Sequence, residues 1–538
     1  MKNSKLYGKV LGVGALLAIV VSCQCKKDGG VCPRKKAEQV IRISIENEPQ
    51  TLDPRKTRSL GDMNLIRNFW EGLVRTDKTG LVQPAIAEKY TISNDNKTYQ
   101  FNLKETNWSN GDPLTAHDFV YAWKKTISPD FLSDYAFLLY SIKNAKAIKE
   151  GQLPMSMLGV RAADDYTLVV ELESATPYFL ELVALPVFFP VNQRVDKQNP
   201  DWFRNSNTYV SNGPFQMAKW NHNDLIVATK NLGYWDRDVV NLDRIDMVMV
   251  DSETSYLMFE NDELDWQGSP YSSVPTDALE RLKGENKVFI SPFLGTYWIR
   301  TNTSLYPFHS SEIRKALALS INRNEIVEHV TCGDQTPATG IVPASMGLQS
   351  TPYFVDGDVE QAMNVFQCAL EKENMNIENF PELTLTYTAT ARHHKIAQAI
   401  QDQWRNSLGI VVKLEPLEKK VYLDRLSKGD YQMACGDWIA DFRDPVSFLE
   451  IFKAKSFGSN NTSWESLDYQ KALESSYLVQ DGQERLETLR DSEQIIMDEM
   501  PVIPIFHHSM VHLKNDCLKD VVLNDTGHID FKWAYVVN

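Results

Sequence analysis

The fold is decided by three consecutive segments, Tyr99-Gln-Phe-Asn-Leu103, Trp108-Ser-Asn-Gly-Asp-Pro113 and Leu114-Thr-Ala-His-Asp-Phe-Val-Tyr-Ala-Trp123. In the first segment the apolar residues occupy every second position. This alternation is typical of a strand with one buried face. The sequence therefore predicts a half-buried strand in the first segment. The second segment separates this strand from the third segment.

The third segment carries the signals of a helix start. Thr115 and Asp118 have the spacing of a capping box, in which each residue satisfies a backbone N–H of the other. Phe119, Ala122 and Trp123 follow at intervals of three and four residues, as on one face of a helix. We expect a capped helix to begin here.

Similar patterns recur along the chain, with strand-like runs and amphipathic helices alternating and no internal repeat. Ser311 precedes a helical pattern formed by Ile313, Ala316, Leu317 and Ile321. A late helix that ends near Pro501 is indicated by Leu486, Leu489, Ile495 and Ile496. Pro501-Val-Ile-Pro504-Ile-Phe506 favours an edge strand, because proline cannot donate to a central ladder. The chain is predicted to be a mixed α/β protein.

The N-terminus has the organisation of an export signal. Lys2 and Lys5 precede an apolar run, residues 10–21, which is too short to span a bilayer comfortably. The run ends at Ser22-Cys23, which resembles a bacterial lipoprotein signal with Cys23 as the lipid attachment site. Residues 1–22 would then be the signal peptide and residues 23–39 a flexible tether. Cleavage without lipidation is the alternative.

Composition narrows the class of function. The 538 residues include 56 basic and 71 acidic side chains, a net charge of −15 that disfavours a nucleic-acid partner. About 500 residues after the signal suffice for two or three domains. The cysteines downstream of the tether are Cys332, Cys368, Cys435 and Cys517, and none of them is spaced as metal ligands are. The sequence does not assign disulfide partners to them.

Enzyme signatures are weak. His393-His394 and His507-His508 are adjacent pairs, unlike the i, i+4 pair of a helical zinc site. The sequence contains neither a G-x-S-x-G nucleophile elbow nor a phosphate-binding G-x-x-x-x-G-K-[ST] loop. We therefore expect no enzymatic activity and no cofactor or metal, with a secreted hydrolase as the alternative from another class.

Eight segments, taken in order, resemble the peptide and nickel family (family 5) of bacterial extracellular solute-binding proteins, and oligopeptide-binding proteins most closely. They begin at residues 48–54, which read Glu-Pro-Gln-Thr-Leu-Asp-Pro, and include the block at 99–123. The others are Phe69-Trp-Glu-Gly-Leu73, Pro84-Ala-Ile-Ala-Glu-Lys-Tyr90, Ser211-Asn-Gly-Pro-Phe215, Asn231-Leu-Gly-Tyr-Trp-Asp236, Ile313-Arg-Lys-Ala-Leu317 and Trp438-Ile-Ala-Asp-Phe442.

The resemblance implies an α/β, two-lobed, hinged periplasmic-binding-protein fold of type II, in the large peptide-binding subclass. Lobe one would comprise residues 40–70, 196–296 and 508–538, with an extra subdomain at 71–195. Lobe two would comprise residues 297–507. The hinges would lie where the chain crosses between lobes, near Gly295-Thr296 and Phe506-His507. Closure would exclude water around a ligand.

The resemblance also implies a function. The chain would be a monomeric, lipid-anchored protein of the periplasm or cell envelope that captures short peptides. It would deliver them to the permease of an ABC importer whose ATPase is a separate subunit. Cell-wall (murein) peptides, a nickel chelate or haem are alternative ligands in the same class, because a fold does not settle a ligand.

A peptide site needs a carboxylate for the ligand's α-ammonium and main-chain groups that pair with an extended peptide. Asp441 matches the family's acidic anchor for the peptide N-terminus. Tyr135 and His393 match positions that border the site, and Trp438 is expected to pack beside the anchor. An ordinary surface or structural role remains the alternative for each residue.

Several positions depart from the family pattern. Leu426 and Cys435 stand where relatives place basic side chains for the peptide carboxylate. Our hypothesis is that Arg58, Arg300 or Lys419 has taken over carboxylate binding, with solvated surface charges as the alternative. A disulfide of some relatives would need cysteines at the positions of Gly295 and Ile439, and both are missing.

Overall fold

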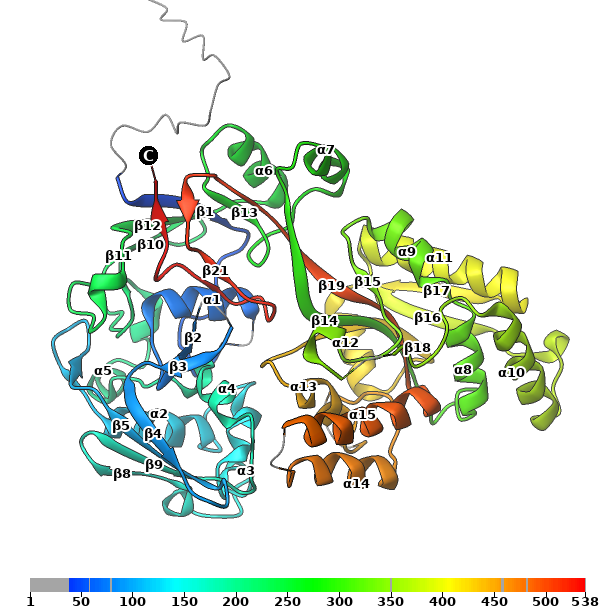
Figure 1. The fold of residues 1–538 in the computed structure, drawn as a ribbon, viewed down its shortest axis with the longest axis horizontal. Helices are drawn as coiled ribbons and strands as arrows, with labels where there is room; N and C mark the ends of the chain where they lie inside the picture. Colours follow the sequence, from blue (N-terminus) through cyan, green and yellow to red (C-terminus); the bar gives the residue numbers. More distant parts are fainter. Residues whose placement is uncertain are drawn as a thin grey trace, which may run out of the picture.

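The computed structural model describes residues 38–57, 59–77, 80–348, 351–455, 459–479 and 482–537. The expected signal peptide, most of the tether, Cys23 and Arg58 lie outside the described residues. The described chain forms two lobes side by side (Figure 1). We use lobe one for residues 38–288 and 515–537, and lobe two for residues 302–501.

One eleven-stranded sheet runs through both lobes, in the order β10-β11-β12-β1-β13-β19-β14-β18-β16-β17, with β15 also paired to β19. Its lobe-one strands are β1 (Val40–Ile45), β10 (Phe215–Asn221), β11 (Leu225–Lys230), β12 (Arg244–Met249) and β13 (Trp266–Gly268). Its other strands are β14 (Phe289–Thr301), β15 (Thr336–Pro337), β16 (Leu383–Thr388), β17 (Val412–Leu417), β18 (Met433–Ile439) and β19 (Val502–Lys514).

The helices α8 (Ser311–Leu319), α9 (Arg323–Ile326), α10 (Val359–Lys372), α11 (Ala391–Leu408) and α12 (Lys419–Lys428) belong to lobe two (Figure 1). So do α13 (Val446–Leu449), α14 (Leu467–Ser476) and α15 (Gly482–Glu499). Lobe one contains α1 (Leu60–Phe69), α5 (Gln193–Gln198), α6 (Ser252–Glu260) and α7 (Leu279–Gly284). It ends in the short strands β20 (Leu518–Lys519), β21 (Val522–Leu523), β22 (Ile529–Asp530) and β23 (Tyr535–Val536).

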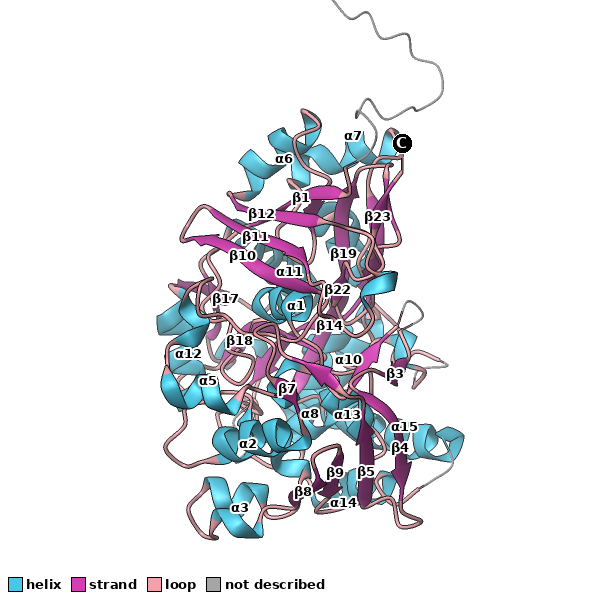
Figure 2. Ribbon diagram, turned by 90° about the vertical axis from the view of Figure 1, so that its left-hand side faces the viewer, coloured by secondary structure: helices cyan, strands magenta, loops and turns pink. Residues whose placement is uncertain are grey.

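A separate four-stranded sheet, β4-β5-β9-β8, lies at the far end of lobe one from the main sheet (Figure 2). We call this sheet, with its helices, the subdomain. It contains β4 (Ala87–Ile92), β5 (Thr98–Leu103), β8 (Val160–Asp164), β9 (Thr167–Glu171), α2 (Ala116–Ile127), α3 (Ala145–Lys149) and α4 (Phe179–Val183). Two small ribbons adjoin it, β2 (Val74–Thr76) with β3 (Val82–Pro84) and β6 (Thr106–Asn107) with β7 (Pro113–Leu114).

The segments that decide the fold behave as predicted. The alternating residues form β5, in which Tyr99, Phe101 and Leu103 are buried. The helix α2 begins at Ala116, and the backbone N–H of Thr115 donates to the Asp118 carboxylate at 3.0 Å, one half of the capping box. Local side-chain spacing is therefore enough to specify this strand and helix.

One local expectation needs correction. The residue that caps α8 is Ser310, whose hydroxyl accepts from Ile313 N–H, because Ser311 is already helical. The predicted edge strand is confirmed for residues 502–504, which pair with β14 on one side, whereas from Phe506 onward β15 pairs on the other side. Pro504 is tolerated because the outer side of its backbone faces no strand of the described chain, and its carbonyl accepts from Arg323 Nε at 2.7 Å. The late helix is confirmed as α15, which ends at Glu499.

The long strands β14 and β19 connect the lobes (Figure 1). They pair antiparallel from Phe289 opposite His512 to Arg300 opposite Val502. Their ladder is interrupted between Pro292 and Thr296, the region expected for a hinge. The two lobes have separate hydrophobic cores on either side of these strands. The hinge motion itself stays a prediction.

Distant motifs meet around one buried carboxylate, Glu71. Its oxygens accept from Tyr234 Oη at 2.7 Å and Trp235 Nε1 at 2.5 Å, and it contacts Arg75 at 3.3 Å. Asn212 donates to the Glu71 carbonyl at 2.9 Å. In the same motif Gly213 must lack a side chain, because a Cβ would approach the backbone of Phe69 and Trp70 to 2.4 Å. These contacts bring together three segments that are far apart in the sequence.

Candidate functional site

A cavity of about 850 Å³ lies between the subdomain and lobe two. The subdomain side contributes aromatic and polar residues, which include Tyr140, Thr176 and Tyr178. The lobe-two side contributes Trp438 and Asp441, together with the helical segment that starts at Val446. A neighbouring cavity of about 150 Å³ shares Asp441 and is also lined by Tyr135. The volume of the larger cavity is within the usual range for a small-molecule site.

The loop after β18 holds the carboxylate in place. The backbone N–H of Asp441 donates to Ser447 Oγ at 3.0 Å. The indole of Trp438 donates to the Ser447 carbonyl at 2.8 Å. Ser447 lies in α13, so one helical residue holds both the backbone of Asp441 and the indole of Trp438. Such support holds a binding group in one geometry before a ligand arrives.

The Asp441 side chain contacts the subdomain at the small neighbouring cavity. The hydroxyl of Tyr135 donates to Asp441 Oδ1 at 3.0 Å. Burial raises the pKa of Asp441 to about 6, and this hydrogen bond opposes the rise. The pKa of Tyr135 is also raised, by burial and by the neighbouring carboxylate. A carboxylate this poorly solvated would gain strongly from a cationic partner.

The residues that follow Asp441 also join the two lobes. The Phe442 ring stacks on Tyr178 of the subdomain, with centroids 4.8 Å apart and an angle of 8° between planes. Arg443 Nε lies 3.0 Å from an Asp525 carboxylate oxygen in lobe one. Asp444 instead faces into lobe two, where Arg485 binds both of its oxygens at 2.8 and 2.9 Å. The loop is therefore held in place by lobe two, and its Phe442 and Arg443 side chains contact lobe one.

A second polar cluster lies along β14 and β18, away from Asp441. His393 Nδ1 is 2.9 Å from the Tyr297 hydroxyl, and burial lowers the pKa of His393. Arg300 is 6% exposed and donates to the Asp437 carbonyl at 3.2 Å. His508 lies 3.5 Å from the Asp437 carboxylate and helps to lower its pKa, against the effect of burial. The cluster thus holds two histidines, an arginine and an aspartate.

The structure therefore brings together three of the predicted residues, Tyr135, Trp438 and Asp441. His393, Arg300 and Lys419 do not line either of the two cavities. Lys419 is exposed at the start of α12, and Arg58 lies outside the described residues. The two positions without basic side chains, Leu426 and Cys435, are both buried. Gly295 and Ile439 lie directly opposite each other in the β14–β18 ladder.

Several cavity residues were missed by sequence reasoning. They are Tyr178, Ser447, Glu450, Lys453 and Tyr477. Ser447 and Glu450 could have been found from their helical spacing, which places residues three apart on one face. Lys453 follows at the same spacing, whereas Tyr178 comes from the subdomain and Tyr477 from the end of α14, and nothing in their local sequence marks these two.

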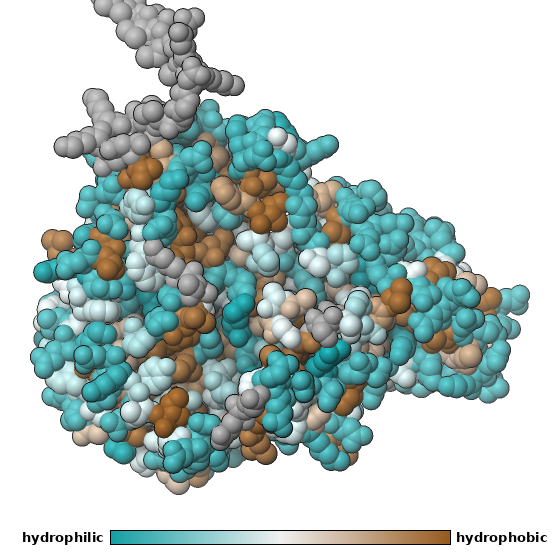
Figure 3. All heavy atoms as spheres, in the orientation of Figure 1, coloured by the Kyte–Doolittle hydropathy of each residue, from teal (hydrophilic) through white to brown (hydrophobic). Residues whose placement is uncertain are grey.

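Within the described residues, no group of three or more His, Cys, Asp or Glu side chains could hold a metal ion. In that part of the chain, no helix is both long and apolar enough to cross a membrane. Hydrophilic residues cover most of the visible face of lobe two, and apolar residues are scattered over lobe one (Figure 3).

Two lobes on a shared sheet, joined by long crossing strands and enclosing a ligand-sized cavity, define the class of bacterial periplasmic binding proteins. Residues 82–460 match the model described as "Bacterial extracellular solute-binding proteins, family 5 Middle". The chain belongs to this family.

Relatives extend over nearly the whole chain. The oligopeptide-binding protein OppA of Bacillus subtilis is 39% identical over 93% of this chain and 93% of that protein. The dipeptide-binding protein DppE of the same organism is 36% identical, with 98% of each chain covered. The structure of Haemophilus influenzae OppA in complex with the peptide RPPGFSPFR aligns with a TM-score of 0.80 and 30% identity, over 93% of this chain and 99% of that one. The expected two-lobed fold is confirmed.

Proposed function

We propose that this chain captures short peptides between its two lobes and delivers them to the permease of an ABC importer. The observation that carries the proposal is Asp441, a carboxylate that lines the cavity between the lobes and whose pKa is raised by burial. A peptide α-ammonium would supply the missing positive charge through a charge-assisted hydrogen bond, which contributes about 1.5–3 kcal/mol. The peptide-binding relatives support the same ligand class.

For the full division of the chain we propose residues 40–70, 196–296 and 508–538 for lobe one, 71–195 for its subdomain and 297–507 for lobe two. The separate cores support the division between the two lobes, while a single core extends through lobe one and the subdomain. Trp438 would pack against the bound peptide near its N-terminus, and Tyr135 would share Asp441 with the α-ammonium. Opening and closing about β14 and β19 would admit and release the ligand.

The free carboxylate of the peptide needs a separate partner. We retain Arg58, Arg300 and Lys419 as the candidates, with His393 bordering the ligand. Arg300 has the strongest support, because it shares its surroundings with Asp437 and His393. Calorimetry with peptides of two to six residues tests the assignment. Unchanged affinity and length preference in Arg58→Ala and Arg300→Ala would rule both out.

Murein peptides are the second candidate ligand, since they also carry an α-ammonium. One solved relative, the murein tripeptide-binding protein MppA in its unliganded open form, aligns with a TM-score of 0.78 and 27% identity over 93% of this chain and 97% of that one. A nickel chelate or haem is less favoured, because Asp441 already offers a site for an ammonium group. We propose no enzymatic activity, and a hydrolase would degrade peptides instead of returning them intact.

We place the protein in the periplasm or cell envelope, attached to the membrane through lipid on Cys23. The lipoprotein-like signal before Cys23 supports this location. Cys23→Ala should move the protein from the membrane fraction to the soluble fraction, and an unchanged distribution would contradict lipidation. We expect a monomer that binds no nucleic acid.

The decisive experiment is mass spectrometry of molecules that co-purify with the protein lacking its tether, followed by calorimetry against wild type and Asp441→Ala. A mixture of short peptides whose binding is strongly weakened by the substitution would support the proposal. A single haem, metal chelate or murein fragment that binds regardless of Asp441 would replace the proposed ligand.

A further inference from the structure

The large cavity contains a second carboxylate besides Asp441. Glu450 begins the helical turn η10 (Glu450–Phe452), which directly continues α13. It lies three residues after Ser447, so both residues occupy the same side of this helical segment and line the cavity. The helical segment whose Ser447 holds the Asp441 loop therefore also places Glu450 in the cavity wall.

Glu450 is a carboxylate without a fixed partner. Among the described residues, none makes a hydrogen bond or an ion pair with its side-chain oxygens. Burial raises its pKa, and Lys453 opposes the rise. Lys453 is itself engaged elsewhere, because its ammonium lies 3.2 Å from Glu474 and 5.4 Å from the centre of the Tyr477 ring. A half-buried carboxylate without a partner is poorly solvated, and a ligand cation would compensate for this.

The walls around Glu450 suit a long side chain that ends in a charge. Tyr178 and Tyr477 lie close enough for their phenol groups to respond to the Glu450 charge. Trp438 lines the same cavity. Aromatic faces of this kind pack against the methylene stem of lysine or arginine and attract its cationic head.

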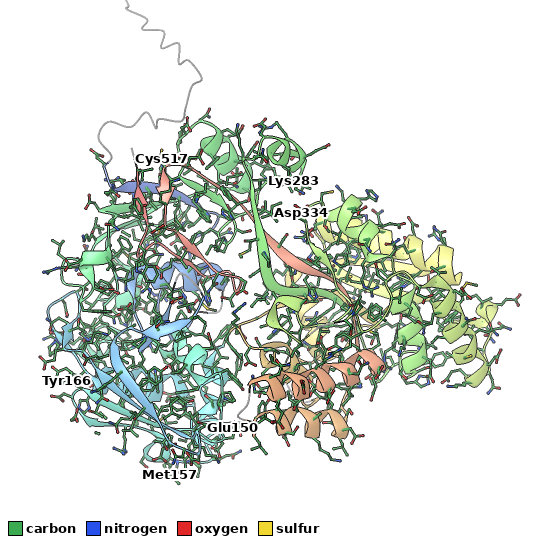
Figure 4. All side chains as sticks on the ribbon, viewed as in Figure 1. Glu150, Met157, Tyr166, Lys283, Asp334 and Cys517 are labelled. Carbon is green, nitrogen blue, oxygen red and sulfur yellow. The ribbon has the colours of Figure 1, made fainter. Side chains whose placement is uncertain are left out.

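The rim of the cavity also carries negative charge. The subdomain contributes Glu150 and Glu173, and lobe two contributes Glu474. Figure 4 places Glu150 at the side of the subdomain that faces lobe two. Five carboxylates line the cavity against two ammonium groups, and one of those two is paired with Glu474. The negative field favours entry of cationic ligands over anionic ones.

We propose that Glu450 binds the cationic side chain of a lysine or arginine near the amino end of the captured peptide. This inference rests on the proposed peptide-binding function and adds a side-chain preference to it. Asp441 would hold the α-ammonium, and Glu450 would hold the side-chain cation in the same cavity. Neutral peptides would still bind through Asp441 and the main chain, but more weakly.

The test is calorimetry with matched tripeptides at neutral pH. Alanine tripeptides carry lysine, arginine, norleucine or glutamate at position one, two or three. Norleucine has nearly the same apolar stem as lysine without the charge. We expect the lysine or arginine peptide to bind at least about tenfold more tightly than its norleucine counterpart at one or more positions.

Variants assign the preference to Glu450. Glu450→Gln should reduce the lysine-to-norleucine ratio to about one, with the loss confined to cationic peptides. Glu450→Lys should reverse the order, so that the glutamate peptide binds better than the lysine peptide. The matched control is Glu378→Gln, at an exposed carboxylate that does not line the cavity. Thermal denaturation establishes that each variant is folded.

The outcomes separate the two proposals. Failure of every peptide to bind wild type would overturn the proposed function itself. Peptide binding with equal affinities for lysine and norleucine would overturn the Glu450 inference alone. A lysine preference that persists in Glu450→Gln would likewise overturn it.

Discussion

The Asp441 carboxylate carries an energetic cost in the ligand-free protein. Its pKa is about 6 in the folded chain, against an ordinary value of 3.8. The folded state therefore binds a proton more readily than the unfolded state between these two pH values. The free energy of unfolding therefore falls as pH rises from about 4 to 6, because the folded state must release this proton. Above pH 6 the folded state carries the full free-energy cost of the ionised Asp441. In the proposed function, the ligand's α-ammonium would remove this cost.

Asp441→Asn should stabilise the ligand-free protein at pH 7.5 and nearly abolish peptide binding. The amide removes the buried charge and can still accept from Tyr135. The pKa shift sets an upper limit of about 3 kcal/mol for the gain. Thermal denaturation at pH 7.5 and pH 4 measures it, because both proteins are neutral at this position at the lower pH. An equal difference in melting temperature at both pH values would contradict the assignment.

Peptide affinity should fall as pH drops through about 6, because the α-ammonium needs an ionised Asp441. Tyr135→Phe should move the midpoint of this fall to higher pH, since the tyrosine hydroxyl stabilises the ionised carboxylate. Dissociation constants measured from pH 5 to 8 test both statements. Tyr166→Phe, at a tyrosine on the far side of the subdomain, is the control (Figure 4). A midpoint that is the same in all three proteins would refute the role of Tyr135.

Sequence reasoning found part of the site at the residue scale. Asp441 and Trp438 were predictable because they share one short motif, and Tyr135 because its position matches the family pattern. Glu450 and Tyr178 were not predicted, because their roles arise from packing between chain segments far apart in sequence. No local spacing reports which buried carboxylate lacks a partner.

At the scale of elements, the Glu71 network links three motifs to the C-terminal region. Arg75 binds Glu71 at 3.3 Å and Asp530 of β22 at 2.7 Å, and both carboxylates are buried. Lys532 lies 3.7 Å from Glu71 and 2.8 Å from Asp236. The network fastens the end of the chain to lobe one.

Glu71→Ala should lower the free energy of unfolding by about 3–5 kcal/mol, because it leaves buried cations and donors without their acceptor. Glu71→Gln should cost less, since the amide oxygen still accepts from Tyr234 or Trp235. Denaturant unfolding followed by tryptophan fluorescence measures both losses. Glu88→Ala, at an exposed residue of β4, provides the comparison. A loss of under 1 kcal/mol in Glu71→Ala would show that the network does not stabilise the fold.

Sequence patterns predict those elements whose signals lie within a few residues of one another. The strand β5 and the helix α2 follow from side chains within a few residues of one another. The full set of neighbours of β19 does not, because they come from residues 266–268, 289–301 and 336–337. The prolines correctly indicated a strand edge at residues 502–504, but no local signal indicated that the same strand continues to Lys514 between β13 and β14.

At the scale of the whole molecule, the lobes touch at places far apart from each other. The residues that follow Asp441 form one such contact. Another is an ion pair between Lys283 of α7 and Asp334 of lobe two, with Nζ and Oδ1 2.6 Å apart (Figure 4). The two-lobed arrangement was predictable only through resemblance to a family, because periodicity defines elements and not their assembly. The contacts between lobes set the balance between open and closed forms.

Phe442 is the side chain that should influence this balance most. It belongs to lobe two, yet it is 6% exposed and packs within the lobe-one core against Tyr178. Opening the lobes would expose the ring, so the contact favours closure even without ligand. Arg443 and Asp525 form a partly exposed pair beside it, which contributes at most about 1 kcal/mol.

Phe442→Ala should therefore shift the ligand-free protein towards open forms, while Arg443→Ala should have a smaller effect. Small-angle X-ray scattering measures this as a larger radius of gyration, which saturating peptide should reverse. Peptide affinity should weaken about two- to tenfold, because binding must then supply the free energy of closure that the aromatic pair no longer contributes. Phe380→Ala, at a half-buried ring of lobe two that lines neither cavity, should change neither quantity. If Phe442→Ala left both radius and affinity unchanged, closure would depend on the ligand and the hinge strands alone.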